Sequence, residues 1–152
     1  MAGRTRVLVL CTGNSARSQM GEGFLRALGG DHFEAHSAGT EIAERVNPLA
    51  VRVMAEVGID ISAQRPKDLG VYDDQEFDLV ITVCDSARQS CPMFLGARAN
   101  VHWDLQDPAA AEGTEQERMA FFRTIRDDVR RRVNHLIVTG EALNDEGDPV
   151  RL

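Results

Sequence analysis

The sequence predicts an α/β fold of three layers, in which helices flank a four-stranded parallel sheet. Short apolar runs, typical of buried strands, alternate with longer segments whose apolar residues have helical spacing. Such alternation gives a parallel sheet that is covered on both faces. The chain has 152 residues, 43% of them hydrophobic and 27% charged, which suits one domain with one core. We therefore expect a single domain over residues 1–139 and a polar, loosely ordered tail over residues 140–152.

Four apolar runs are the candidate strands. They cover residues 6–10, 33–37, 77–83 and 101–103. The first and third runs are nearly continuous in apolar residues, as expected for strands that are buried on both faces. The segment 85–98 contains proline and glycine and is expected to be irregular.

Three segments carry helix signals. The first, residues 18–28, ends at a pair of glycines that suits a C-cap. The second starts at Asn47, an N-cap residue followed by proline, and ends before Gly58. The last starts at Thr114, which forms a capping box with Glu117 ahead of a long apolar stripe.

The most informative segment joins the first strand to the first helix. Its residues are Cys11, Thr12, Gly13, Asn14, Ser15, Ala16, Arg17 and Ser18. The backbone N–H groups of such a turn and helix start bind an oxyanion. The same positive field stabilises a thiolate, so Cys11 is a candidate nucleophile. The guanidinium of Arg17 can hold two oxygens of a tetrahedral anion, and Ser18 can donate a hydrogen bond to the sulfur.

This pattern must be weighed against an inert buried thiol. Cysteine is among the most buried residue types, and a lone one at a strand end commonly has no chemistry. A cysteine directly after an apolar strand, with Arg17-Ser18 closing the following turn, favours a catalytic site instead.

Two further candidates also follow predicted strands. Because the carboxyl ends of parallel strands meet at one edge of a sheet, Cys84 and Asp107 are expected near Cys11. Asp107 can protonate a leaving oxygen, although an Asp-Pro dipeptide also starts turns readily. Cys84 and Cys91 leave three interpretations open, which are a zinc site, two unrelated buried thiols and a redox pair.

Charge and cysteine content narrow the class of protein. The formal net charge of −7 argues against nucleic acid and against an anionic membrane as partners. No apolar run is long enough to span a bilayer, and the N-terminal one is too short for a signal peptide. We expect a cytoplasmic protein, where three cysteines indicate chemistry or metal rather than a disulfide scaffold.

Taken together, these motifs resemble the thioredoxin-coupled arsenate reductases, which share the fold of the low-molecular-weight tyrosine phosphatases. The resemblance runs from about residue 6 to about residue 136. The residues that carry it are 11–18, 36–40, Asn47-Pro48, Cys84 with Cys91, and Asp107-Pro108.

The resemblance implies a relay of three cysteines in a catalytic domain that serves arsenic detoxification. Cys11 would attack arsenate held by the loop amides and Arg17, while Asp107 protonates the departing hydroxyl. Cys84 would then attack Cys11 and release arsenite. Cys91 would next attack Cys84, leaving a Cys84–Cys91 disulfide that thioredoxin reduces.

The resemblance also implies the ligands. No tightly bound cofactor is expected, and phosphate or sulfate would mimic arsenate in a monomeric enzyme. Some members hold a monovalent cation, potassium or sodium, whose ligands would map onto Asn14, Glu22, Ser37 and Asp68. Many relatives have a second loop cysteine where this chain has Ala16, which leaves Cys84 and Cys91 as the internal thiol partners of Cys11.

Two other functions stay open. A low-molecular-weight tyrosine phosphatase would use the same loop through a phosphocysteine. It commonly has an aromatic residue after the Asp-Pro pair, where this chain has alanines at 109–111. The third possibility is a non-enzymatic redox or oxyanion sensor.

Overall fold

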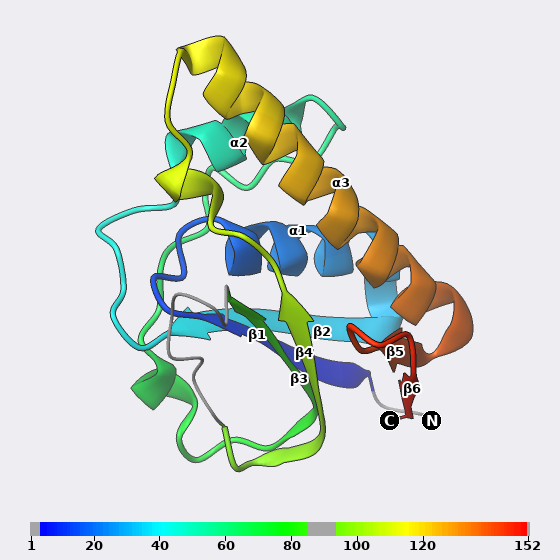
Figure 1. Cartoon of the computed structure of the whole chain (residues 1–152). Coiled ribbons are helices and arrows are strands. Elements are labelled where there is room, and N and C mark those ends of the chain that lie inside the picture. The colour runs from blue at the N-terminus through cyan, green and yellow to red at the C-terminus, as the bar shows by residue number, and fades with distance from the viewer. Residues whose placement is uncertain (1–3, 85–93, 152) are drawn as a thin grey trace.

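The computed structural model describes residues 4–84 and 94–151, and its centre is a four-stranded parallel sheet (Figure 1). The strands are β1 (Thr5–Cys11), β2 (Phe33–Gly39), β3 (Phe77–Cys84) and β4 (Ala97–Asp104). They are ordered β2-β1-β3-β4 across the sheet, and each neighbouring pair is parallel. The predicted α/β fold with four parallel strands is confirmed.

The central strand β1 is apolar throughout because it is buried on both faces. Val7 and Val9 belong to the larger core cluster, whereas Leu8 and Leu10 belong to a smaller cluster on the opposite face. All four side chains have no exposed surface. The period of two expected of a strand is therefore hidden in a continuous apolar run.

Three helices lie together over one face of the sheet (Figure 1). They are α1 (Arg17–Gly29), α2 (Pro48–Ala55) and α3 (Glu115–Thr139), and their apolar sides close the larger core. Asn47 and Thr114 cap α2 and α3 as their sequences predict, with the full capping box at Thr114.

The opposite face of the sheet is covered by shorter elements in the described part of the chain. The 3₁₀ turn η2 (Leu69–Tyr72) brings Tyr72 against Phe77 and the leucines of β1. Two other 3₁₀ turns, η1 (Gly30–His32) and η3 (Pro108–Ala110), lead into β2 and follow β4.

Strand β4 is longer than the predicted run of residues 101–103. Its ladder with β3 extends from the pair Phe77 and Ala97 to the pair Cys84 and Asp104. Because β4 is the edge strand, outward positions such as Arg98 and Asn100 are exposed and polar, which hides its first half from an apolar pattern.

The C-terminal segment differs from the predicted loose tail. Strands β5 (Glu141–Leu143) and β6 (Pro149–Arg151) pair antiparallel. Ala142 is fully buried, and the indole N–H of Trp103 donates to the carbonyl of Leu143 at 3.0 Å. The composition is polar because only one face of this short hairpin meets the core.

The strand order sets the location of a ligand site. The chain moves from β1 outward to β2 on one side and to β3 and β4 on the other. Ligands of open parallel sheets bind beyond the carboxyl ends of the strands where this direction changes, which here is the end of β1 and β3. No helix in residues 4–84 and 94–151 has the length and apolarity to cross a membrane.

Candidate active site

The loop between β1 and α1 is shaped around Asn14. This residue has a φ of 49°, in the left-handed region, and its side chain is fully buried. Its side-chain oxygen accepts hydrogen bonds from the backbone N–H of Lys67 at 2.8 Å and from Gln19 Nε2 at 3.0 Å. Its Nδ2 donates to Ser18 Oγ at 2.8 Å. These partners fix the amide orientation and hold the loop in a tight curve.

The sulfur of Cys11 lies inside this curve as a free thiol with 2% of its surface exposed. The backbone N–H of Asn14 donates to Sγ at 3.1 Å, and Ser18 Oγ lies 2.8 Å from it. With Cys11 ionised, the Ser18 hydroxyl would be the donor in this contact, since a thiolate has no proton to give. The surroundings of Cys11 thus include one backbone donor and one hydroxyl, both within hydrogen-bond distance of the sulfur.

The start of α1 supplies further donors around the same point. The helix begins at Arg17, and the preceding Ala16 has no side chain with which to cap the first turn. The first-turn N–H groups of such a helix suit an oxyanion. The hydroxyl oxygen of Thr12 is buried and has no hydrogen-bond partner among the described residues. An anion in the loop would give this hydroxyl a partner.

The side chain of Arg17 is aimed across the loop by the segment that follows β4. Its exposed fraction is 4%, and Nη1 donates to the carbonyl of Leu105 at 2.9 Å. Nη2 lies 3.8 Å from Asp107 Oδ2. The other carboxylate oxygen of Asp107 accepts from the N–H of Ala109 at 3.0 Å and caps η3. The structure thus brings Arg17 and Asp107 together at the edge where Cys11 lies.

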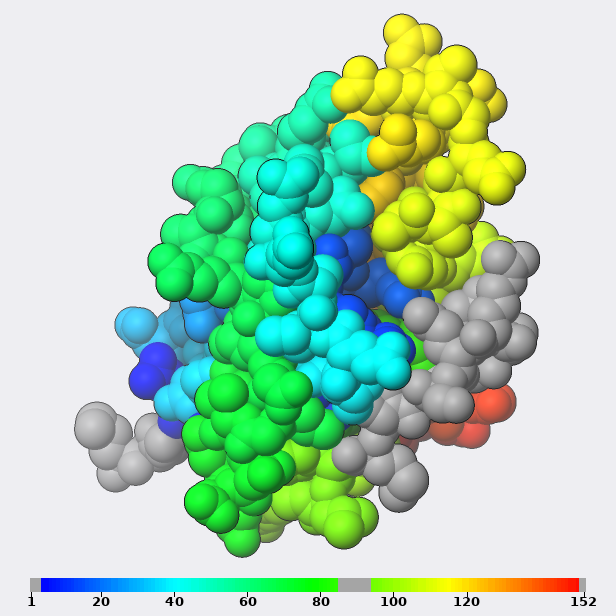
Figure 2. Space-filling view, turned by 90° about the vertical axis from the view of Figure 1, so that its left-hand side faces the viewer, coloured from blue at the N-terminus to red at the C-terminus, as the bar shows by residue number. Residues whose placement is uncertain are grey.

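One side of the loop is closed by the segment that follows β2. The carbonyl of Thr12 accepts from Thr40 and Glu41 at 3.0 and 2.9 Å. A Cβ on Gly39 would lie 2.5 Å from that same carbonyl oxygen, so the position requires glycine. Figure 2 shows dark-blue atoms of the first part of the chain in a hollow between this cyan segment and the yellow-green segment after β4.

Cys84 ends β3 and is fully buried. It is disulfide-bonded, and its carbonyl accepts from the N–H of Leu105 at 3.2 Å. Leu105 therefore contacts both Cys84 and, through its own carbonyl, Arg17. The pairing of Leu10 with Thr82 places Cys11 and Cys84 at the ends of neighbouring strands. Cys91, the third predicted sulfur, lies outside the described residues.

The four residues expected to hold a monovalent cation do not form one cage. Ser37 Oγ donates to Glu22 Oε1 at 2.7 Å, but the side-chain oxygen of Asn14 already accepts two N–H groups. Asp68 is exposed and caps Gly70 through its Oδ1 at 2.8 Å. The Lys67 ammonium lies 3.4 Å from Glu22 Oε1 and gives that carboxylate a positively charged neighbour. These contacts do not fit a bound sodium or potassium ion.

Several residues of the site were not found by sequence reasoning. Gln19, fully buried, donates to Asn14 and to the carbonyl of Arg65. Gly39 had a signal, because glycine at a strand end indicates close backbone approach. Lys67 and Leu105 had none, since their contacts join segments far apart in sequence.

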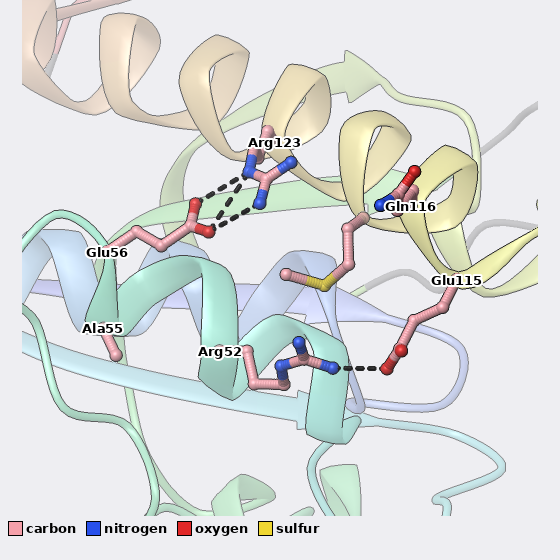
Figure 3. Close-up of a pocket in the computed structure, with 7 residues that line it drawn as sticks. Arg52, Ala55, Glu56, Glu115, Gln116 and Arg123 are labelled. Atoms are coloured by element: carbon pink, nitrogen blue, oxygen red, sulfur yellow. Dashed lines mark hydrogen bonds and ion pairs between the residues drawn. The ribbon is translucent and has the colours of Figure 1, made fainter.

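A separate hollow of about 630 Å³ lies between α2 and α3. Figure 3 shows Arg52 directed at Glu115 and Glu56 directed at Arg123 across the gap between the two helices. The Arg123 hydrogen bond, followed by that of Arg126, lowers the pKa of Glu56 to about 2. The two arginines and two glutamates that line this hollow pair with each other. These ion pairs join the two helices, and they leave no unpaired positive charge among the four residues to bind a second anion.

Comparison with known proteins adds to this geometry. The family described as low molecular weight phosphotyrosine protein phosphatase matches residues 6–148. The chain belongs to this family. Within it, relatives named arsenate reductase cover almost all of the chain. That of Halalkalibacterium halodurans is 44% identical over 135 residues, which are 89% of this chain and 96% of that protein. That of Bacillus licheniformis is 45% identical with the same coverage.

Solved structures of the family share the fold. One described as an arsenate reductase in the phosphate binding state has a TM-score of 0.75 and 36% identity, covering 88% of this chain and 97% of that one. A low molecular weight tyrosine phosphatase from T. tengcongensis has a TM-score of 0.68 and 28% identity, covering 88% and 98%. A thioredoxin-dependent arsenate reductase of Corynebacterium glutamicum has a TM-score of 0.64 and 26% identity, covering 89% and 61%.

Proposed function

We propose that this chain is an arsenate reductase. Cys11 is the nucleophile that attacks arsenate, and Cys84 is the thiol that then attacks Cys11 and releases arsenite. The observation that carries the proposal is the position of a second sulfur at the end of the strand beside the anion loop, linked by Leu105 to the arginine of that loop. The relatives named arsenate reductase support it.

Arsenate would bind with its oxygens toward the loop N–H groups and the guanidinium of Arg17. Residues 12–18 form the cradle, and the hydroxyl of Thr12, which has no hydrogen-bond partner within residues 4–84 and 94–151, offers one more donor. Arg17 is held by its hydrogen bond to Leu105, so little of its side-chain entropy is lost when it binds an anion.

In the first chemical step the Cys11 thiolate would attack arsenic. A sulfur–arsenic bond forms and an arsenic–oxygen bond breaks. The Asp107 carboxyl gives its proton to the departing oxygen, which leaves as water. The hydrogen bond from Ser18 keeps the sulfur directed into the loop.

In the second step the Cys84 thiolate would attack Cys11 Sγ. A sulfur–sulfur bond forms, and the electron pair of the sulfur–arsenic bond stays on arsenic, which leaves as arsenite. Cys91 would then attack Cys84, forming the Cys84–Cys91 disulfide and freeing Cys11. A dithiol protein such as thioredoxin supplies the two electrons that restore both thiols. The relative named thioredoxin-dependent supports that choice of reductant.

A phosphatase would use the same first step and then water in place of Cys84. The fold shared with the T. tengcongensis phosphatase allows slow phosphate-ester hydrolysis as a side activity. The alanines at 109–111 offer no ring beside Asp107 to pack against a tyrosine substrate.

The test is NADPH consumption with arsenate, thioredoxin and thioredoxin reductase, measured for the wild type and for Cys84→Ser. We expect sustained turnover by the wild type and none by the variant. Hydrolysis of p-nitrophenyl phosphate is the matched control, because it requires Cys11 but not Cys84. Full arsenate turnover by Cys84→Ser would contradict the proposal.

A further inference from the structure

Glu22 is a buried carboxylate that the proposed chemistry does not use. It projects from α1 behind the anion loop, and its exposed fraction is 1%. Ser37 donates one hydrogen bond to it. An ionised carboxylate at such a position requires a compensating positive charge, since burial without one costs several kcal/mol.

Lys67 supplies that charge from inside the protein. Its ammonium lies 3.4 Å from Glu22 Oε1 and donates to the carbonyl of Arg65 at 2.9 Å. Arg26 lies 3.3 Å from the other carboxylate oxygen, but its side chain is 54% exposed. Only 27% of the Lys67 side chain is exposed, so Lys67 is the better shielded of the two cations.

The backbone of Lys67 also holds the anion loop. Its N–H donates to the side-chain oxygen of Asn14, the left-handed residue of the loop, at 2.8 Å. Its carbonyl accepts from the N–H of Gly39 at 2.9 Å. One residue therefore neutralises the buried carboxylate and supports the loop conformation.

We propose that the Lys67 ammonium is the resident cation of the anion loop, so that neither loop stability nor anion binding in this chain depends on potassium or sodium. This inference rests on the anion-binding part of the proposed function and not on the sulfur relay. It follows that removing the amine should create a dependence on a monovalent cation.

The structure provides a route by which such a cation would reach Glu22 in a variant. A hollow of about 710 Å³ is open beside α1, and Glu22, Arg26 and Lys67 are among the residues that line it. Replacing Lys67 by methionine keeps the length and apolar stem of the side chain. It leaves the carboxylate with space and no ammonium.

The experiment compares melting temperature in potassium chloride and in choline chloride, each at about 0.1 M so that ionic strength is equal. We expect no potassium-specific change for the wild type or for Lys67→Arg. We expect Lys67→Met to melt lower in choline and to recover in potassium. Arg65→Met is the matched control, because it removes an exposed positive charge from the same segment while the Arg65 carbonyl keeps its contacts.

Phosphate affinity provides the second measurement. The Kd of Lys67→Met for inorganic phosphate should rise about tenfold in choline and return toward the wild-type value in potassium. If the variant does not fold in choline, its refolding yield in the two salts replaces the melting curve, with a higher yield expected in potassium.

A potassium-specific stabilisation of the wild type would overturn the inference, as would a Lys67→Met variant that ignores potassium. The melting comparison needs no bound anion. A wild type that fails to bind phosphate would therefore contradict the proposed function, and would do so separately from this result.

Discussion

The guanidinium of Arg17 lies 3.8 Å from the carboxylate of Asp107, which places the residue that would hold the oxyanion beside the one that would protonate its leaving oxygen. Both are positioned by the segment after β4, because Leu105 accepts a hydrogen bond from Arg17 and η3 is capped by Asp107. Contacts within the protein therefore hold both side chains in place.

The first prediction concerns the proton from Asp107. Asp107→Asn keeps the cap on η3 but cannot donate an acidic proton, so the rate of arsenate turnover should fall by about a hundredfold or more. Inorganic phosphate should bind about as tightly as before, because Arg17 and the loop N–H groups that would hold it are unchanged. Steady-state kinetics and calorimetry measure the two quantities, and a variant with unchanged kcat would exclude Asp107 as the acid.

The second prediction concerns the approach of β2 to the loop. In Gly39→Ala the added Cβ would lie 2.5 Å from the Thr12 carbonyl oxygen and 2.9 Å from that of Cys11. Because both are backbone atoms, the loop must shift, which should cost about 1–3 kcal/mol of unfolding free energy and weaken phosphate binding. In Gly70→Ala the near atom belongs to the Asp68 side chain, which can move, so this control should bind phosphate normally.

The third prediction concerns the C-terminal hairpin. Deleting residues 141–152 exposes Trp103, which is 1% exposed in the structure, and removes its hydrogen bond to Leu143. The unfolding free energy should fall by about 2 kcal/mol. Trp103 is the only tryptophan of the chain, so its fluorescence reports the change directly by a shift to longer wavelength. An unchanged spectrum and melting curve would show that the hairpin is dispensable.

The fourth prediction is a pH dependence of stability from the α2–α3 clamp. Arg123 and Arg126 lower the pKa of Glu56 from 4.5 to about 2 in the folded chain. A lowered pKa stabilises the fold above the unfolded value, and this contribution is lost as pH falls toward 2. Wild type should therefore be more stable than Glu56→Gln in denaturant melts at neutral pH, and the difference should shrink below pH 4.5.

An exposed carboxylate serves as the control for this comparison. Glu44→Gln alters a residue for which no ion pair is found within residues 4–84 and 94–151, so its stability difference should be small at every pH. A Glu56→Gln difference that stays constant down to acid pH would contradict the assigned pKa.

Much of the fold could be predicted because local chemistry and global packing agree. The continuous apolar runs of β1 and β3, the Asn47 cap and the Thr114 capping box each have one structural meaning, and the structure has them. The edge strand β4 and the hairpin were harder to recognise, since a strand with one polar face looks like a loop.

The site divides in the same way. The loop from Cys11 to Ser18 could be predicted because a strand, a turn and a helix start are adjacent in sequence. The supports of that loop come from Gln19, Gly39 and Lys67, and from Leu105, which directly follows β4. Their roles depend on distances between segments, which no local pattern contains. The same limit applies to the expected cation ligands. The sequence places Glu22 in that set, but only the fold shows that the Lys67 ammonium lies beside its carboxylate.

The central claim is that Cys84 attacks Cys11 in the arsenic adduct, forms a disulfide with it and releases arsenite. A single turnover without any reductant tests this claim most directly. Fully reduced protein is mixed with arsenate, the remaining thiols are counted by alkylation and mass spectrometry, and released arsenite is measured. We predict that wild type releases about one arsenite per chain and loses two of its three thiols, whereas Cys84→Ser releases none. Equal arsenite release by Cys84→Ser, or release by wild type with all its thiols intact, would contradict the account.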